Sequence, residues 1–137
     1  MWQVDYTDEF RSWFDSLENE KAVASIRAAV RVLRDEGPTL GRPLVDTVEN
    51  SAYANMKELR PLGTSIRILF AFDPRRAAIL LVGGDKAGEW NAWYVEHIPI
   101  ADTIYAEHIR TLEMEAAAKV QRQGKRHTRG SKGGKGQ

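Results

Sequence analysis

The sequence predicts an α+β fold in which two helices pack on one face of a small, twisted antiparallel sheet and a further helix follows. Two N-terminal segments repeat their apolar residues with the period of an amphipathic helix. Three short apolar runs then follow within residues 53–84, with only tight turn signals between them. Strands joined this closely must pair antiparallel, because a parallel pair needs a long crossover connection.

The first third of the chain is expected to hold one extended segment and two helices. Residues 2–6 are extended, and Thr7 is the N-cap predicted for the first helix, because acidic residues follow it. The second helix is predicted to begin near Asn19 and to end at the stop signal Gly37-Pro38. The first helix carries apolar residues at the spacing i, i+3, i+4, i+7: Phe10, Trp13, Phe14 and Leu17.

The rest of the chain is expected to form the sheet and the last helix. Residues 38–52 are predicted to be an irregular connection, and residues 92–98 a short strand. Pro99 is predicted to open the last helix, which ends near Lys119. The three central strands are predicted at residues 53–60, 65–73 and 77–84.

The composition limits the classes of protein that the chain can belong to. Its 137 residues suit one domain, and it has no cysteine, which excludes disulfides, zinc–thiolate sites and thiol catalysis. No apolar run approaches the roughly 20 residues that span a bilayer. The acidic N-terminus lacks the pattern of a signal peptide. We therefore expect a soluble, cytoplasmic protein.

The charge is distributed unevenly along the chain. Residues 119–137 carry seven Lys or Arg and no acidic residue, whereas residues 1–118 carry 13 basic and 19 acidic residues. We therefore expect a folded domain over residues 1–118 and a basic, Gly-rich, disordered tail over residues 119–137. The tail either contacts nucleic-acid phosphates or only adds solubility.

Arg67 raises the main question of the sequence, because it interrupts the most apolar strand. Alternation along a strand places Arg67 on the face opposite the core, where we expect it to be uncovered. If the turn before this strand spans residues 61–64, Glu58 lies opposite Arg67. A slip of one residue would bring Lys57 and Leu59 to that face instead. The core face of the strand is predicted to carry Ile66, Ile68, Phe70 and Phe72.

The predicted sheet face gathers basic side chains on an otherwise acidic domain. Arg60, Arg67 and Lys86 are expected there, together with Lys57 if the register allows it. Such a surface attracts a phosphate backbone. The structural alternative is a cross-strand pair of Glu58 with Arg67, and a solvated Lys86 in a loop.

Two segments of the chain resemble a known family. "MKELRPLGTSIRILFAFDPRRAAILLVGGDKAG" (residues 56–88) and "IPIADTIYAEHI" (residues 98–109) are similar to the RelE/HigB toxins of bacterial type II toxin–antitoxin systems. The branch concerned is that of the phage-derived Gp49-like proteins, and the resemblance covers roughly residues 2–115. It implies a RelE/ParE-like version of the predicted fold.

The resemblance also implies an activity. Such toxins cleave mRNA on the ribosome without a metal or cofactor: the 2′-hydroxyl attacks the adjacent phosphate and leaves a 2′,3′-cyclic product. By this likeness Arg67 would contact the scissile phosphate, and Lys86 would be a second cation or the general acid. Arg60 and Lys57 would hold the phosphate or the backbone. The implied partner is a helix-turn-helix antitoxin, whose acidic or amphipathic segment covers the cationic face.

The segment after the third strand departs from the family pattern. A histidine, an aromatic residue and two lysines are usual there, whereas "VGGDKAGEWNAWY" retains only Lys86. His97 or Tyr94 is a candidate acid or base. Trp90 and Trp93 are candidates for stacking on RNA bases, unless they are core or lid aromatics. His97 is otherwise an ordinary polar residue at the junction between the predicted strand and the last helix.

Two other functions remain open from the sequence. ParE-type toxins share the fold but bind DNA gyrase and lack the basic catalytic set, whereas Arg60, Arg67 and Lys86 favour the nuclease. The chain could also be a degenerate toxin that only binds RNA or an antitoxin, because a fold alone does not determine function.

Overall fold

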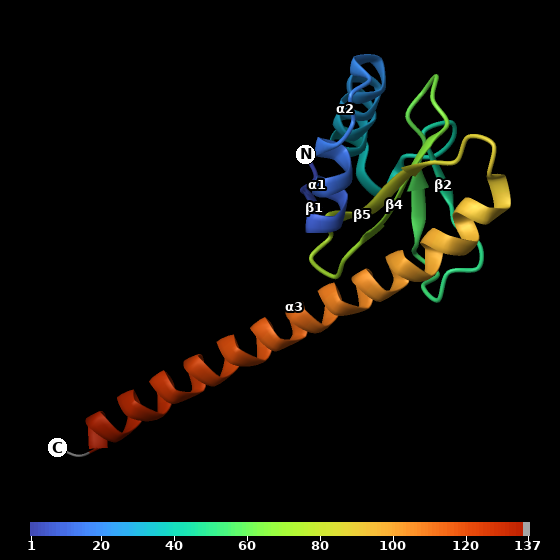
Figure 1. Cartoon of the computed structure of the whole chain (residues 1–137). Coiled ribbons are helices and arrows are strands. Elements are labelled where there is room, and N and C mark those ends of the chain that lie inside the picture. The colour runs from blue at the N-terminus through green and yellow to red at the C-terminus, as the bar shows by residue number, and fades with distance from the viewer. Residues whose placement is uncertain (136–137) are drawn as a thin grey trace. The chain divides into compact units, whose positions relative to one another are not determined.

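The computed structural model describes the backbone of residues 1–135 and the side chains of residues 1–124. A compact unit covers Met1–Tyr105, and a second unit begins at Ala106. The first unit contains a five-stranded sheet with the strand order β1-β5-β4-β3-β2 (Figure 1). Its strands are β1 (Val4–Tyr6), β2 (Val45–Thr47), β3 (Lys57–Leu59), β4 (Ile66–Phe72) and β5 (Ala78–Asp85).

Both N-terminal helices begin where the sequence predicts, and α2 also ends at the predicted stop signal, whereas α1 ends before Leu17 of its predicted apolar face. Helix α1 (Asp8–Asp15) is capped by Thr7, whose side chain accepts a hydrogen bond from the backbone N–H of Phe10. Helix α2 (Glu20–Glu36) is capped by Asn19 in the same way and ends at Gly37 with φ of 66°. A short 3-10 turn, η1 (Gly37–Thr39), follows. Local capping chemistry is sufficient to place these boundaries.

The sheet is mixed, which corrects the prediction of a purely antiparallel sheet. Strand β1 pairs parallel to β5, and the other neighbours pair antiparallel. The long connection between β1 and β5 permits a parallel pair. Residues 38–52 were predicted to be irregular, but they contain strand β2. The sequence did not indicate this strand, because three residues are too few to show alternation.

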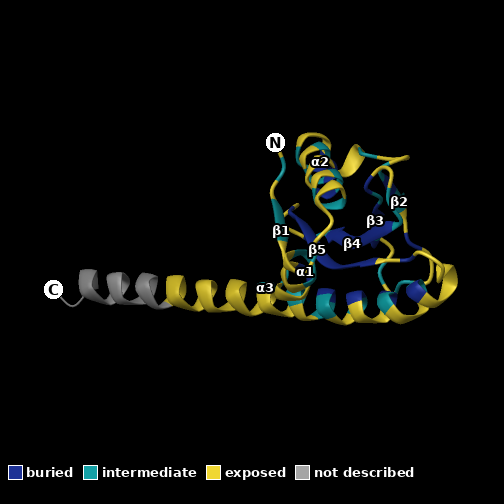
Figure 2. Cartoon of the chain, turned by 45° about the horizontal axis from the view of Figure 1, so that its top comes forward, coloured by how far each residue is buried: buried dark blue, intermediate teal, exposed yellow. Residues whose placement is uncertain are grey.

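Helices α1 and α2 cover one face of the sheet, as predicted. Phe10 from α1 and Ile26 and Leu33 from α2 share a buried cluster with Ile68 and Phe70 from β4. Figure 2 shows β4 and β5 almost entirely buried, whereas β1 at the edge of the sheet is only partly so. The other members of this cluster are Ala29, Val45, Leu59, Ile66, Ala78 and Leu80.

The opposite face of the sheet is covered too, which contradicts the expected open face. Helix α3 (Trp90–Lys135) begins nine residues before Pro99, so the predicted strand over residues 92–98 is wrong. Trp93 and Tyr94 suggested a strand by their β-propensity. A helical spacing of four residues instead runs across Pro99 through Trp93, His97, Ala101 and Tyr105, all of them buried or half-buried.

Helix α3 continues to Lys135, beyond the predicted end near Lys119. Residues 119–124 are helical and exposed, where the sequence predicts an irregular tail. The side chains of the tail beyond residue 124, and with them its predicted contact with nucleic acid, lie outside the described residues. Within the described chain, no helix combines the length and apolar character that crossing a membrane requires.

We expect Gly83→Ala to destabilise the domain by about 1–3 kcal/mol, because a Cβ at this position would overlap the ring of Trp13 on α1. Urea unfolding measures the change. Gly41→Ala is the matched control, since a Cβ there meets nothing within 4 Å, and its effect should stay within about 0.5 kcal/mol. Equal losses in the two variants would contradict the proposed fit of α1 on β5.

Candidate active site

The register of the β3–β4 hairpin decides which side chains join Arg67. Glu58 pairs with Leu69 rather than with Arg67, so the register differs by two residues from the predicted one. A shift of two keeps every side chain on its face. Glu58 therefore remains on the Arg67 face, whereas Lys57 lies on the opposite face together with Leu59 of the core.

Arg67 is buried in the structure and does not lie on an open surface. Only 7% of the residue is exposed, because the start of α3 covers this face. Its Nε lies 3.4 Å from Oε1 of Glu58, and its Nη1 donates a hydrogen bond to the carbonyl of Ile66 at 2.7 Å. Among the residues whose side chains are described, none forms a hydrogen bond with this Nε atom. Glu58 thus provides the compensating charge that a buried guanidinium needs.

Tyr94 on α3 is the third member of this buried group. Its hydroxyl donates a hydrogen bond to Oε1 of Glu58 at 2.7 Å. Burial first, and then the hydrogen bond to Glu58, raise the pKa of Tyr94 to about 12. The hydroxyl therefore stays protonated at neutral pH and acts as a donor, not as a base.

Glu58 and Tyr94 of this group also line a pocket of about 470 Å³. Its lining contains the cations Arg42, Arg60 and Lys86 and the carboxylates Asp46, Glu49 and Glu58. Nη1 of Arg60 lies 4.0 Å from Oδ2 of Asp46, and Nη2 of Arg42 lies 2.8 Å from the same oxygen. The pocket is lined by Arg42, Asp46, Thr47, Val48, Glu49, Asn50, Glu58, Arg60, Lys86, Trp90, Asn91, Tyr94 and Ile98.

The ammonium group of Lys86 contacts the ring of Trp90. Its Nζ lies 3.2 Å from the ring centroid of Trp90, and only 4% of the residue is exposed. Burial first, and then the charges of Arg67 and Arg60, lower the pKa of Lys86 from 10.5. Trp90 itself is 66% exposed, so one side chain separates the lysine from solvent. Lys86 thus lines the pocket with the ring of Trp90 over its ammonium.

The other predicted site residues lie outside this pocket. Trp93 is buried, and a Cβ at Gly84 would overlap its indole ring, so Trp93 is a core aromatic. His97 stacks on Trp93 with ring centroids 4.3 Å apart, and its Nδ1 lies 2.8 Å from the carbonyl of Trp93. Neither residue lines the pocket, and neither does Lys57.

Sequence reasoning did not find the residues that β2 and the loop before it contribute. Asp46 and Arg42 line the pocket, and their ion pair lowers the pKa of Asp46, mainly through the hydrogen bond that Arg42 donates. Asp46 pairs with Glu58 across the β2–β3 ladder. This pairing joins distant segments, and no local pattern in residues 38–52 indicated it.

The chain is similar in sequence to known proteins. The sequence profile of the phage-derived protein Gp49-like family matches residues 12–106. "Putative toxin HigB3" of Mycobacterium tuberculosis is 66% identical over 90 residues, which are 66% of this chain and 78% of that protein. "Putative toxin HigB2" of the same organism is 48% identical over 115 residues, 82% of this chain and 56% of that protein. The chain thus spans just over half the length of HigB2.

Solved structures share the fold. The isolated RelE toxin of Escherichia coli matches with a TM-score of 0.53 and 8% identity, over 72% of this chain and 99% of RelE. A mutant of that toxin in the free state matches with a TM-score of 0.52 over 69% of this chain and 92% of its own. At this identity the likeness concerns the fold, and it confirms the predicted RelE-like architecture.

We expect Glu58→Gln to destabilise the domain by about 3–5 kcal/mol, because it leaves the Arg67 guanidinium buried without a compensating charge. Urea unfolding at neutral pH measures this loss. Asp46→Asn is the control, because it removes the carboxylate of a more exposed ion pair and should cost below about 1 kcal/mol. A small loss for Glu58→Gln would show that Arg67 does not need this partner.

Lys86→Met should make the domain more stable at neutral pH, since the ammonium of Lys86 is charged at a cost in the folded state. Between its lowered folded pKa and 10.5, the unfolded chain binds more protons, so wild-type stability rises with pH in that interval. The variant should lack this rise. Denaturation from pH 7 to 10.5 tests it, with Lys21→Met, an exposed lysine on α2, as the control. A rise of equal size in Lys86→Met would refute the assignment.

Proposed function

The chain belongs to the phage-derived Gp49-like family of RelE/HigB-type toxins, and we propose that it is the toxin of a type II toxin–antitoxin system that cleaves mRNA on the ribosome. Both curated relatives are named as toxins, which supports the assignment of this chain as a toxin. The nuclease activity is supported by the pocket described above. The expected partners are mRNA on the ribosome and a helix-turn-helix antitoxin, and the expected location is the cytoplasm.

The main support for the proposed nuclease activity is the set of cations that line one pocket. Arg60 and Lys86 both line it, and Arg67 lies directly behind Glu58 in its wall. The pocket lining has three cations, Arg42, Arg60 and Lys86, and three carboxylates, Asp46, Glu49 and Glu58. A phosphate that enters the pocket would meet Arg60 and Lys86, and cations positioned in advance stabilise the charge that develops on its oxygens.

The proposed reaction needs no metal or cofactor. The 2′-oxygen forms a bond to the adjacent phosphorus, and the bond from phosphorus to the 5′-oxygen breaks, leaving a 2′,3′-cyclic phosphate and a 5′-hydroxyl. Arg60 and Lys86 stabilise the phosphorane, and Lys86 gives a proton to the leaving 5′-oxygen. Its lowered pKa suits this role, because a general acid works best when its pKa approaches the operating pH.

Glu58 is the carboxylate that accepts the proton of the 2′-hydroxyl in this proposal. Arg42 holds the pKa of Asp46 below its usual value, so Asp46 is poorly suited to accept a proton. Arg67 and Tyr94 orient Glu58 from behind. Arg67 is then a positioning residue rather than the direct phosphate contact that the family resemblance implies, since the structure buries it.

Trp90 has a second role in this proposal. Its exposed indole covers Lys86, and an unpaired RNA base offers a flat surface on which the same ring can stack. Stacking would move Trp90 off the lysine and bring a phosphate to it. Trp93 and His97 have no such role, because they pack against each other outside the pocket.

The proposal is tested by expressing the chain under control in bacteria and mapping mRNA 5′ ends together with plasmid supercoiling. We expect new 5′ ends within translated codons and unchanged supercoiling. Arg60→Gln and Lys86→Met should each lower cleavage on the order of 100-fold, as the loss of one charge-stabilising donor does. Lys21→Gln, an exposed lysine away from the pocket, controls for the charge.

Other results of this experiment would support one of the two alternative functions. Altered supercoiling without cleavage would mean a gyrase-directed toxin of the ParE type. Neither effect would mean a module that binds RNA or an antitoxin only. Because Lys86→Met is expected to be more stable than the wild type, a loss of cleavage in that variant cannot be attributed to unfolding.

A further inference from the structure

We propose that the outer part of helix α3, residues 106–124, binds the same segment of a second copy of this chain as an antiparallel pair of helices. This segment, called the outer helix below, belongs to the second unit, which begins at Ala106. The pairing does not depend on the nuclease activity. The partner is assigned from the exposure of the outer helix, from its apolar stripe and from the order of its charges.

The outer helix lacks the contacts that normally stabilise a helix. Every residue from 113 to 124 is exposed (Figure 2). Glu115 and Lys119 have the i, i+4 spacing of an ion pair, yet among the residues whose side chains are described neither takes part in one. A helix in a protein draws most of its stability from the packing of one face against other elements. We therefore expect this segment to have a partner.

One face of the outer helix carries an apolar stripe. Its members are Ile109, Leu112, Ala116 and Val120, at steps of three or four residues. Ile109 and Val120 are eleven residues apart, close to three turns of helix, so the stripe runs straight along the helix. Val120 is 67% exposed. Two stripes of this kind pack against each other when helices pair side by side, and the small side chain of Ala116 permits a close approach at the middle.

The charges of the outer helix determine the direction of the pair. Residues 106–115 carry three acidic groups and one arginine, whereas residues 116–124 carry two basic groups and no acidic one. A parallel pair would place like charges side by side, which is unfavourable. An antiparallel pair brings each acidic half beside the basic half of the other copy. The segment is therefore complementary to itself in the antiparallel direction.

The stripe and the charges agree on one register. If Ala116 of one copy lies opposite Ala116 of the other, Leu112 of each copy faces Val120 of its neighbour. In the same register, Glu115 lies beside Lys119 of the other copy, along one edge of the stripe. Because the pair is symmetric, both contacts form twice.

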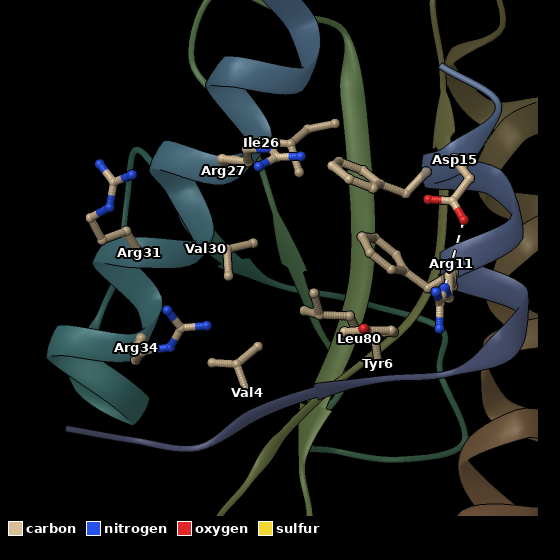
Figure 3. Close-up of a pocket in the computed structure, with 12 residues that line it drawn as sticks. Val4, Tyr6, Arg11, Asp15, Ile26, Arg27, Val30, Arg31, Arg34 and Leu80 are labelled. Atoms are coloured by element: carbon tan, nitrogen blue, oxygen red, sulfur yellow. Dashed lines mark ion pairs between the residues drawn. The ribbon is translucent and has the colours of Figure 1, made fainter. Parts of the chain in front are cut away.

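The outer helix is separate from the two concave surfaces of the first unit. One of these is the pocket that contains Lys86. The other is a groove of about 490 Å³ between α1 and α2, which α2 lines with Arg27, Val30 and Arg31 (Figure 3). No residue of the outer helix lines either surface. Substitutions in the outer helix therefore test self-association without changing the lining of the pocket or of the groove.

Analytical ultracentrifugation of the full chain tests the pairing. We expect a reversible dimer, whose dissociation constant rises about tenfold or more in Val120→Glu, because this variant places a carboxylate in the apolar stripe. Met114→Glu is the matched control, since Met114 is 66% exposed but lies on the opposite side of the helix. A wild-type chain that stays monomeric at every concentration would leave the outer helix to a different partner and overturn the proposal. Equal weakening in the two variants would overturn it as well.

Disulfide cross-linking tests the direction of the pair, and the absence of native cysteine makes it specific. Under mild oxidation, a mixture of Leu112→Cys and Val120→Cys chains should give a covalent dimer, whereas neither variant should cross-link with itself. In the proposed register, the two copies of residue 112 lie roughly 12 Å apart along the helix axis, too far for a disulfide. Cross-linking of each variant with itself would mean a parallel pair and would contradict the proposed arrangement.

Discussion

Glu58 is the side chain on which the arrangement of the site depends. Its Oε1 accepts the hydroxyl of Tyr94 and faces the Nε of Arg67, so a single carboxylate joins β3, β4 and α3. A buried guanidinium without such a partner would carry a large desolvation cost. The pair therefore permits a cation to lie behind the pocket, and the tyrosine ties the helix that covers the pocket to the same point.

Two consecutive glycines in β5 allow the sheet to be covered on both faces. Gly83 and Gly84 point to opposite faces, and the indole rings of Trp13 and Trp93 occupy the space that a Cβ would need. Close approach of α1 to one face and of α3 to the other depends on this pair. As a result, α1 packs on one face of β5 and the start of α3 packs on the other.

Lys86, the proposed general acid, is held in the fold at a cost in stability. Lys86 is covered by Trp90 and lies near Arg60 and Arg67, and burial and both charges oppose its protonation. A stable fold does not require such a group, and costly charged groups of this kind are enriched at functional sites. The exposed indole above the lysine shows how the group could be sheltered in the free protein and still reach a phosphate.

The sequence by itself determined the features that local chemistry controls. Thr7 and Asn19 mark the helix starts because a cap is a local hydrogen bond, and alternation placed Arg67 opposite the core even though the register moved by two residues. The chain's likeness to the Gp49-like toxins was also readable from short motifs. Only the tertiary structure decided that Arg67 is buried, that Trp90 covers Lys86 and that Asp46 joins the pocket. These features arise where α3 and β2 pack against strands that are distant in the sequence. No local stretch of sequence contains both partners of such a contact, so local patterns do not predict it.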